Sequence, residues 1–211
     1  FAARWEQPFG GSTAEESFGL ADGTTVDVPT MRSDVRAATA SVDGWQAVRL
    51  RYATTEGPGL RTDVLLPPAG VDVRRPDAAV LARLTTALDA AAPDLVELWL
   101  PRLDLTSTTD LVPTLEAAGL GHLMHAGRSG LDAMLASTSE PLEIGQAVQQ
   151  AVLRIDEDGT RAAAVTELGM RIASLPAEPT AVLHVDRPFL VTVADATTGW
   201  PVFLAAVDDP R

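Results

Sequence analysis

The chain has 211 residues, of which 46% are hydrophobic and 21% are charged, and its formal net charge at pH 7 is −13. A chain of this length and apolar content can bury the core of one domain, whereas its negative charge argues against nucleic acid or an anionic membrane surface as the main partner. It contains no Cys, which excludes a disulfide framework and a thiolate metal site.

No apolar run approaches the roughly 20 residues that span a bilayer, so we expect no membrane anchor. No signal peptide is visible in the sequence, which leaves the compartment open between the cytoplasm and the extracellular space. The basic residues are all Arg and Ala is abundant, which we interpret as the codon bias of a high-GC genome.

Residues 1–70 are predicted to form strands joined by turns. Asp22-Gly23 indicates a turn, and residues 24–28 alternate after it. Positions 48, 50 and 52 are apolar or aromatic and alternate with Arg49 and Arg51, which predicts a strand with one wet face. Residues 60–66 form a further strand that Pro67-Pro68 ends.

The periodicity then becomes helical over residues 76–91, where Val80, Leu81, Leu84 and Leu88 fall on one face between two prolines. Residues 94–105 return to alternation, which predicts a strand.

A short helix is predicted next, capped by Thr109-Asp110 and ending at Gly119, with a loop over residues 121–141. His122 and His125 have the spacing of two metal ligands on one helical turn, but no third ligand is near, so we predict no metal site.

Residues 144–155 are predicted to form a long strand, and residues 180–207 three more, with a turn at Thr198-Gly199. Neither an internal repeat nor a linker interrupts the chain, which indicates one domain over residues 1–211. The usual nucleophile-elbow, phosphate-loop and zinc-helix motifs are missing, so we expect neither an enzyme nor a cofactor.

One stretch, residues 153–174, has a pattern that its composition does not support. From Thr160 onward, alternate residues are small and then apolar, while the residues between them carry every charge. Such a pattern is typical of a half-buried strand, but Ala, Gly, Glu and Met are poor strand formers and good helix material. The residues therefore leave open an ordinary helix or loop and a loop that becomes a strand later.

This stretch resembles the hinge of the serpin family, which reads Glu, any residue, Gly, Thr or Ser, any residue, then small residues and a Thr. The matching residues are Glu157, Gly159, Thr160, Ala162, Ala163, Ala164 and Thr166. Four further segments resemble family motifs in family order: RWEQPF with Trp5, LWLPRLDL over residues 98–105, LHVDRPFLVTV with Asp186, Arg187, Pro188 and Phe189, and the ending over residues 197–210.

The resemblance implies an α+β, serpin-like multi-sheet fold, mostly β with a few helices, in which residues of about 157–180 form an exposed reactive loop. Only the C-terminal portion of the family is matched. We therefore expect a fragment that lacks the N-terminal helices and part of the main sheet, so that the missing N-terminal part of the same fold is a partner. Together with the codon bias, the resemblance suggests a high-GC bacterium as the source.

The function that the resemblance implies is inhibition of a serine protease as a suicide substrate, through an acyl-enzyme and insertion of the cut loop into the main sheet. The family register places the reactive bond at Ala173–Ser174, 14 residues from Thr160 when both ends are counted. A small Ala at the cut suits an elastase-like or subtilisin-like protease. The alternative bond, Arg171–Ile172, suits a trypsin-like one.

Two departures weaken the case for inhibition. Gln149 stands where the family commonly has His, and the missing N-terminal part would supply the strand beside the slot that the loop fills, so we expect the intact parent to inhibit and this chain alone not to. Residues 126–130 also lack the Asp that the family usually has there. A second reading is a non-inhibitory or degenerate relative whose loop is simply cleaved. A binding module or enzyme outside the family is a third reading.

Overall fold

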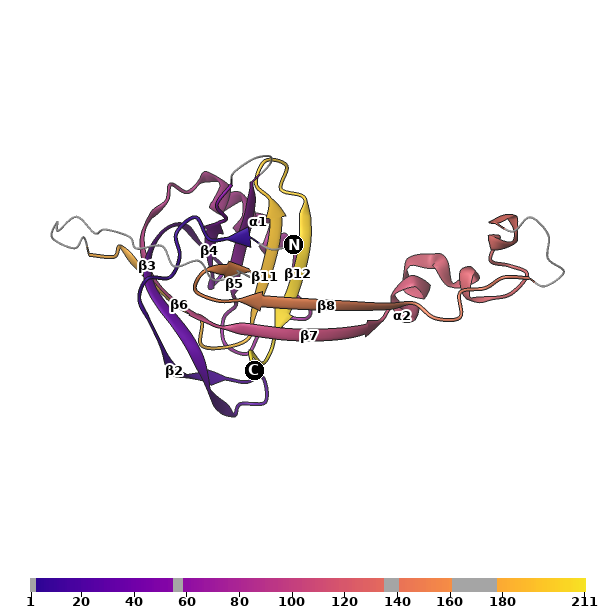
Figure 1. Ribbon diagram of the computed structural model, residues 1–211, viewed down its shortest axis with the longest axis horizontal. Helices are drawn as coiled ribbons and strands as arrows, with labels where there is room; N and C mark the ends of the chain where they lie inside the picture. The colour runs from indigo at the N-terminus through magenta and orange to yellow at the C-terminus, as the bar shows by residue number, and fades with distance from the viewer. Residues whose placement is uncertain (1–2, 55–58, 135–140, 161–177) are drawn as a thin grey trace. The chain divides into compact units, whose positions relative to one another are not determined.

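The structure is a computed structural model that describes residues 3–54, 59–134, 141–160 and 178–211 (Figure 1). The chain divides into two compact units, Phe1–Asp104 with Arg154–Arg211, and Leu105–Leu153. The expectation of one domain stays a prediction.

Most of the strands belong to one sheet with the order β10-β6-β3-β4-β5-β11-β12 in the described residues, and β2 pairs with β3 beside it (Figure 1). Their bounds are β2 Ser12–Gly19, β3 Thr25–Val42, β4 Trp45–Arg51, β5 Leu60–Leu66, β6 Asp94–Pro101, β10 Ala181–His184, β11 Phe189–Asp195 and β12 Pro201–Val207. The strands predicted at residues 24–28 and 60–66 and the three predicted after residue 180 are confirmed.

A two-residue turn joins β3 to β4. Asp43 and Gly44 have φ angles of 50° and 79°, the left-handed pair that a tight hairpin requires and that Asp-Gly adopts readily.

The prediction of a wet face on β4 is corrected. Arg49 on β4 is only 7% exposed and pairs with Asp63 on β5. The face predicted to be wet is therefore partly buried, and an ion pair makes that burial tolerable.

Helix α1 (Ala78–Ala90) covers one face of this sheet and confirms the helical periodicity. Asp77 caps it by accepting a hydrogen bond of 2.8 Å from the backbone N of Ala79, which starts the helix after Pro76. Val80, Leu84 and Leu88 are buried, and they pack with the sheet residues Ala38, Trp45, Ala47, Leu65 and Leu190.

A second sheet contains β1 (Ala3–Arg4), β9 (Gly159–Thr160), β8 (Val148–Ile155) and β7 (Leu103–Asp110), in that order among the described residues. The strand predicted over residues 94–105 is confirmed as far as Pro101. There the chain leaves one sheet, and it enters the other at Leu103.

The strand predicted over residues 144–155 begins only at Val148. Before it, the backbone N of Ile144 donates to Leu123 O and Ala147 O accepts from the N of Leu111, so these groups bond to nearby turns.

The smaller unit also contains α2 (Val112–Leu115) and three short helical turns, Glu116–Leu120, Gly121–Met124 and Leu131–Met134. The predicted cap is corrected, because Thr109 and Asp110 both lie in β7 and the residue at the N-cap is Leu111, which makes no side-chain cap bond; Asp110 accepts a hydrogen bond of 3.0 Å from the backbone N of Val112. Gly119 ends the turn with a φ of 83°. Among the described residues, no helix has the length and apolar character needed to cross a membrane.

Candidate functional site

The serpin-like hinge is the candidate site, and its first residues already lie in a sheet. Strand β9 consists of Gly159 and Thr160 and lies between β1 and β8. Ala3 pairs with Thr160 on one side, and Ile155 pairs with Thr160 on the other, both in antiparallel register.

Thr160 is 5% exposed, and its hydroxyl bonds to buried polar side chains. Its Oγ1 lies 2.6 Å from the hydroxyl of Tyr52, which in turn accepts a hydrogen bond of 2.7 Å from Thr62. Burial raises the pKa of the Tyr52 phenol above an ordinary value that already leaves it protonated at neutral pH, so it has a proton to share. A small hydroxyl is thus satisfied at a position where a charged side chain would lose its hydration.

Position 159 needs a glycine, because the backbone of β1 lies too close for a side chain. Its φ is 151°, and a Cβ added there would lie 2.2 Å from the carbonyl oxygen of Ala3 and 2.7 Å from the Cα of Arg4. Because both are backbone atoms of β1, no side-chain rotation could relieve the clash. The glycine therefore allows the hinge to approach β1.

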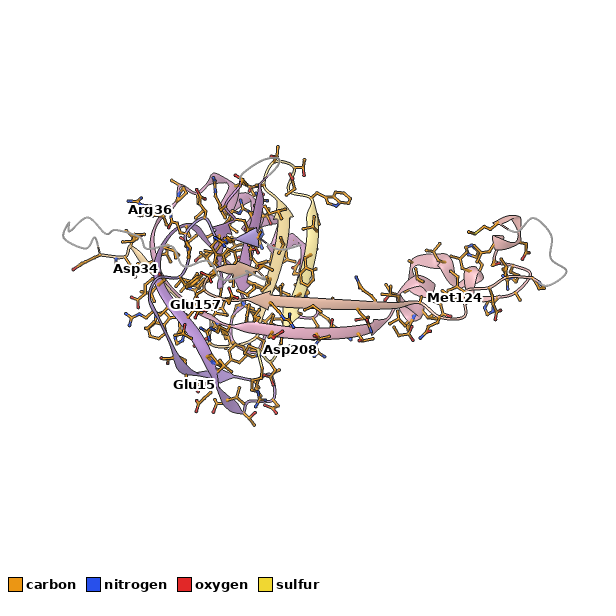
Figure 2. The ribbon with its side chains drawn as sticks, viewed as in Figure 1. Glu15, Asp34, Arg36, Met124, Glu157 and Asp208 are labelled. Atoms are coloured by element: carbon orange, nitrogen blue, oxygen red, sulfur yellow. The ribbon has the colours of Figure 1, made fainter. Side chains whose placement is uncertain are left out.

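Glu157 lies in the turn before the hinge (Figure 2), and two side chains bind its carboxylate. Arg102 binds its carboxylate through Nε at 2.9 and 3.0 Å and through Nη2 at 2.5 Å, and the hydroxyl of Thr13 donates to the same carboxylate. Burial works to raise the pKa of Glu157, but the bonds from Arg102 and Thr13 outweigh it and hold that pKa below its usual value.

Trp5 also binds this turn, through its indole and through its backbone. Its indole Nε1 donates to the carbonyl of Asp156 at 3.0 Å, and its backbone N donates to the carbonyl of Asp158 at 2.9 Å. The indole is 3% exposed and stacks on Tyr52, with ring centroids 4.6 Å apart and an interplanar angle of 11°. The predicted signature residue Trp5 therefore positions both the turn and the hydroxyl partner of the hinge.

Sequence reasoning missed four residues of this site: Thr13, Tyr52, Thr62 and Arg102. Each comes from a different strand or connection, and each is far from the hinge in the chain. The one available signal was Arg102, which lies inside the LPRL segment that resembles a family motif.

The other predicted residues fall into two groups. The signature around Pro188 is structural: Arg187 Nε donates to the carbonyl of Pro67 at 2.9 Å and Nη1 to Asp186 at 2.8 Å, while Phe189 is fully buried with its ring edge toward Phe18. The second group lies outside the described residues: Ala162, Ala163, Ala164, Thr166, Arg171, Ile172, Ala173 and Ser174.

In the parts of the chain that the structure describes, no three His, Asp or Glu side chains lie close enough together to hold a metal ion.

Comparison with known proteins agrees with this geometry. A family model described as Serpin (serine protease inhibitor) matches residues 1–210. The chain is 33% identical to an alpha-1-antitrypsin-like protein, GS55-MS, of Ictidomys tridecemlineatus, in an alignment that covers 100% of the chain and 49% of that relative. The chain thus spans about half the length of the curated relatives it matches.

Solved structures show the same fold. The thermophilic serpin tengpin in its native state matches with a TM-score of 0.79 and 21% identity, over 98% of this chain and 52% of that one. Human thyroxine-binding globulin, solved in complex with thyroxine, matches with a TM-score of 0.78 and 26% identity, over 99% of this chain and 54% of that one. The expected α+β, mostly β fold is confirmed.

Proposed function

The chain belongs to the serpin family, and from this premise we propose that residues 157–180 form the reactive loop of a suicide inhibitor of serine proteases. In this proposal the serine hydroxyl of the protease attacks the carbonyl of the reactive peptide bond, the C–N bond breaks and a new amino terminus leaves. The loop, now joined to the protease as an ester, then lengthens β9 as a new strand. Members of the family are generally protease inhibitors and not enzymes. The target class and the trapping step belong to the proposal.

The observation that carries the proposal is the position of β9. Thr160 is already paired on both sides, with Ala3 of β1 and Ile155 of β8. Among the described residues, β8 pairs with β9 at Ile155. A segment that continued from Thr160 in the same register would pair with β8 before Ile155.

Continuing this register predicts which residues after Thr160 would lie opposite which residues of β8. Continuing the antiparallel pairing of Thr160 with Ile155 sets Ala162 opposite Leu153 and Ala163 opposite Val152. Leu153 is 4% exposed and Val152 is 54% exposed, so the two alanines fall on opposite faces of the sheet. The alternation seen in the sequence thus agrees with the faces of β8: uncharged residues at even positions meet the buried face, and charged residues at odd positions meet the wet one.

The reactive bond stays a prediction. Ala173–Ser174 lies 14 residues into the loop, counting from Thr160, which is roughly 46 Å of extended strand. The alternative Arg171–Ile172 would insert a shorter segment, which favours simple cleavage over trapping.

A pair of matched substitutions tests the insertion. Ala162→Arg places a cation on the buried face, and Ala163→Arg places the same cation on the exposed face. We expect Ala162→Arg to convert trapping of elastase or subtilisin into plain cleavage, whereas Ala163→Arg retains a protease adduct that survives denaturing gel electrophoresis. Thr160→Arg should behave as Ala162→Arg does. Equal trapping by both Ala→Arg variants would defeat the register.

This test needs a second strand beside the inserted segment, on the side opposite β8. In the described residues β1 has two residues, so a strand flanking residues 161–167 on the side opposite β8 has to come from elsewhere. We expect trapping only in a protein that contains that strand, and the reading frame upstream of Phe1 decides whether this one does. The bacterial source stays a prediction.

The second candidate, a relative whose loop is cut as an ordinary substrate, is favoured by one observation. A solved structure similar to this chain is a complex with thyroxine, so family membership alone does not establish protease trapping. Rapid turnover of the loop without an adduct, in a protein with both flanking strands, would support this candidate.

A further inference from the structure

A cavity of about 440 Å³ lies where several connections of the larger unit meet. Its lining comes from the turn between β2 and β3, the connection from β5 to α1, the connection from β10 to β11, and the segment after β12. The volume falls within the range of about 300–1,000 Å³ that is typical of small-molecule sites.

Prolines and valines form the apolar wall of this cavity. Pro67 and Pro68 follow β5 and Pro188 precedes β11, and a proline ring fixes its own φ angle. Val73 is 1% exposed and Val71 is 39% exposed, so the wall extends from the core to the surface. The backbone N of Val71 donates to the carbonyl of Pro68 at 3.3 Å, which closes the connection on itself. Such a wall is largely pre-formed, so a ligand would have little of the protein to order.

Arg187 supplies a positioned hydrogen-bond donor to the lining. Its Nε donates to the carbonyl of Pro67 at 2.9 Å, and its Nη1 donates to Asp186 at 2.8 Å. These two bonds fix the guanidinium, whereas its Nη2 has no partner within the described part of the chain. The side chain is 28% exposed, so the N–H groups of Nη2 are available to a ligand.

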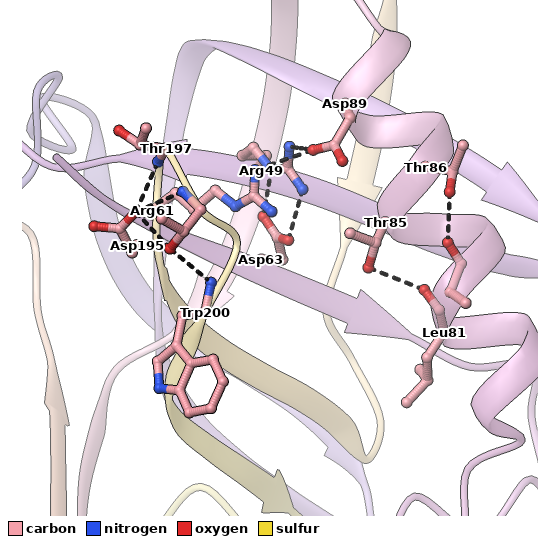
Figure 3. Close-up of polar contacts among 12 residues, drawn as sticks. Arg49, Arg61, Asp63, Leu81, Thr85, Thr86, Asp89, Asp195, Thr197 and Trp200 are labelled. Atoms are coloured by element: carbon pink, nitrogen blue, oxygen red, sulfur yellow. Dashed lines mark hydrogen bonds and ion pairs between the residues drawn. The ribbon is translucent and has the colours of Figure 1, made fainter. Parts of the chain in front are cut away.

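Arg49 gives the contrast of an arginine that serves the structure alone. Its Nε and Nη2 donate to Asp63 at 2.7 and 2.9 Å, and its Nη1 donates to Asp89 at 2.5 Å (Figure 3). All three of its nitrogens thus bind carboxylates of the protein. Arg187 differs because one of its nitrogens is left for a partner from outside.

The charges around the cavity favour an uncharged ligand. One arginine and two aspartates, Asp72 and Asp208, line the cavity of a chain whose net charge is −13, so an anion would be repelled. A cation is not favoured either, because Asp208 already accepts from Arg74 Nε at 2.6 Å and Asp72 accepts from the backbone N of Arg74 at 2.9 Å. A neutral oxygen can still accept a hydrogen bond from Arg187.

We propose that this cavity binds a small uncharged molecule that has an apolar body and a carbonyl oxygen. The oxygen accepts a hydrogen bond from Arg187 Nη2, and the body packs against the valines and prolines of the wall. A hydrogen bond from a charged donor is stronger than one between neutral groups, so the carbonyl contributes to affinity as well as to orientation. The proposal does not rest on protease trapping, since the described residues that line the cavity lie outside the hinge.

Fluorine NMR titration of the chain with two matched probes tests the proposal. Para-fluoroacetophenone carries the carbonyl, and para-fluoroethylbenzene has a methylene in its place. We expect the ketone to bind saturably in the millimolar range or tighter, and the ethyl compound to bind about tenfold more weakly, the loss expected for one hydrogen bond from a charged donor. Arg187→Met should lower the affinity for the ketone to that of the ethyl compound and leave the affinity for the ethyl compound unchanged.

A second pair of variants keeps the test decisive if Arg187→Met does not fold. Val71→Asp places a carboxylate at the exposed end of the apolar wall and should weaken binding of both probes by about tenfold. Its matched control is Val202→Asp, at a valine that is 53% exposed on β12 and lies outside the cavity. The proposal is overturned if the ketone does not bind, if the two probes bind the wild type equally, or if the control weakens binding as much as Val71→Asp does.

Discussion

At the scale of single residues, the hinge is held by contacts that come from far along the chain. Thr160 reaches Tyr52, Tyr52 reaches Thr62, and the indole of Trp5 stacks on the same phenol ring. Each hydroxyl in this series is buried and has a partner, so removing one leaves another unsatisfied.

Tyr52→Phe is therefore expected to destabilise the chain by about 1–2 kcal/mol, because it keeps the stacked ring but leaves the hydroxyls of Thr160 and Thr62 without their partner. Urea unfolding measures the change. Thr160→Val should cost a similar amount, and the double variant should cost less than the sum of the two. Strict additivity would show that the two hydroxyls are not coupled in solution.

Glu157 gives the turn a dependence on pH. Its pKa is lower in the folded chain than its ordinary value, so its contribution to stability is present above the unfolded pKa and is lost as the pH falls through the folded pKa. Between about pH 6 and pH 3 the wild type should thus lose more stability than Glu157→Gln, whose side chain does not titrate.

Arg102→Gln should show the same weakened acid dependence, because it removes the chief partner of that carboxylate. Urea midpoints measured at each pH give the comparison. Identical slopes for all three chains would mean that the pair of Glu157 and Arg102 does not form in solution.

At the scale of elements, α1 and the sheet beneath it form the core that positions β4 and β5. Leu84 is fully buried against this sheet, while Thr86 on the same helix is exposed. The helix therefore contributes through one face only.

Leu84→Ala is expected to cost about 2–5 kcal/mol, the usual loss for a leucine truncated in a packed core. Thr86→Ala, two positions away, should stay within about 0.5 kcal/mol. Chemical denaturation of both variants measures the difference, and a small loss at Leu84 would show that α1 does not pack as described.

At the scale of the whole molecule, the position of β9 between β1 and β8 connects the fold to the proposed function. If residues after Thr160 continue β9 in a protein that has both flanking strands, a protease nick at Ala173–Ser174 will free them to pair along β8, and the hydrogen bonds and buried area gained will raise the unfolding temperature. Calorimetry before and after nicking measures the rise. The nicked Ala162→Arg variant, which puts a charge on the buried face, should show none, and a nicked wild type with an unchanged unfolding temperature would argue against insertion.

Much of the fold was predictable because period and turn chemistry are local properties. The spacing of Val80, Leu84 and Leu88 specified α1, and the Pro67-Pro68 stop marked the end of β5. The sequence was misleading where long-range partners overrode the pattern. Arg49 looked solvent-facing until Asp63 paired with it, and residues 144–147 looked like a strand although their backbone groups bond to nearby turns.

What the amino-acid sequence determined by itself was the family and the period-two pattern of uncharged and charged positions after Thr160, because motif spacing and alternation are properties of the chain alone. Only the tertiary structure decided that Gly159 and Thr160 lie between β1 and β8, that Thr160 bonds to Tyr52 and Tyr52 to Thr62, and that Arg102 binds Glu157. These facts depend on which distant segments meet in space, and neither propensity nor spacing along the chain encodes such meetings.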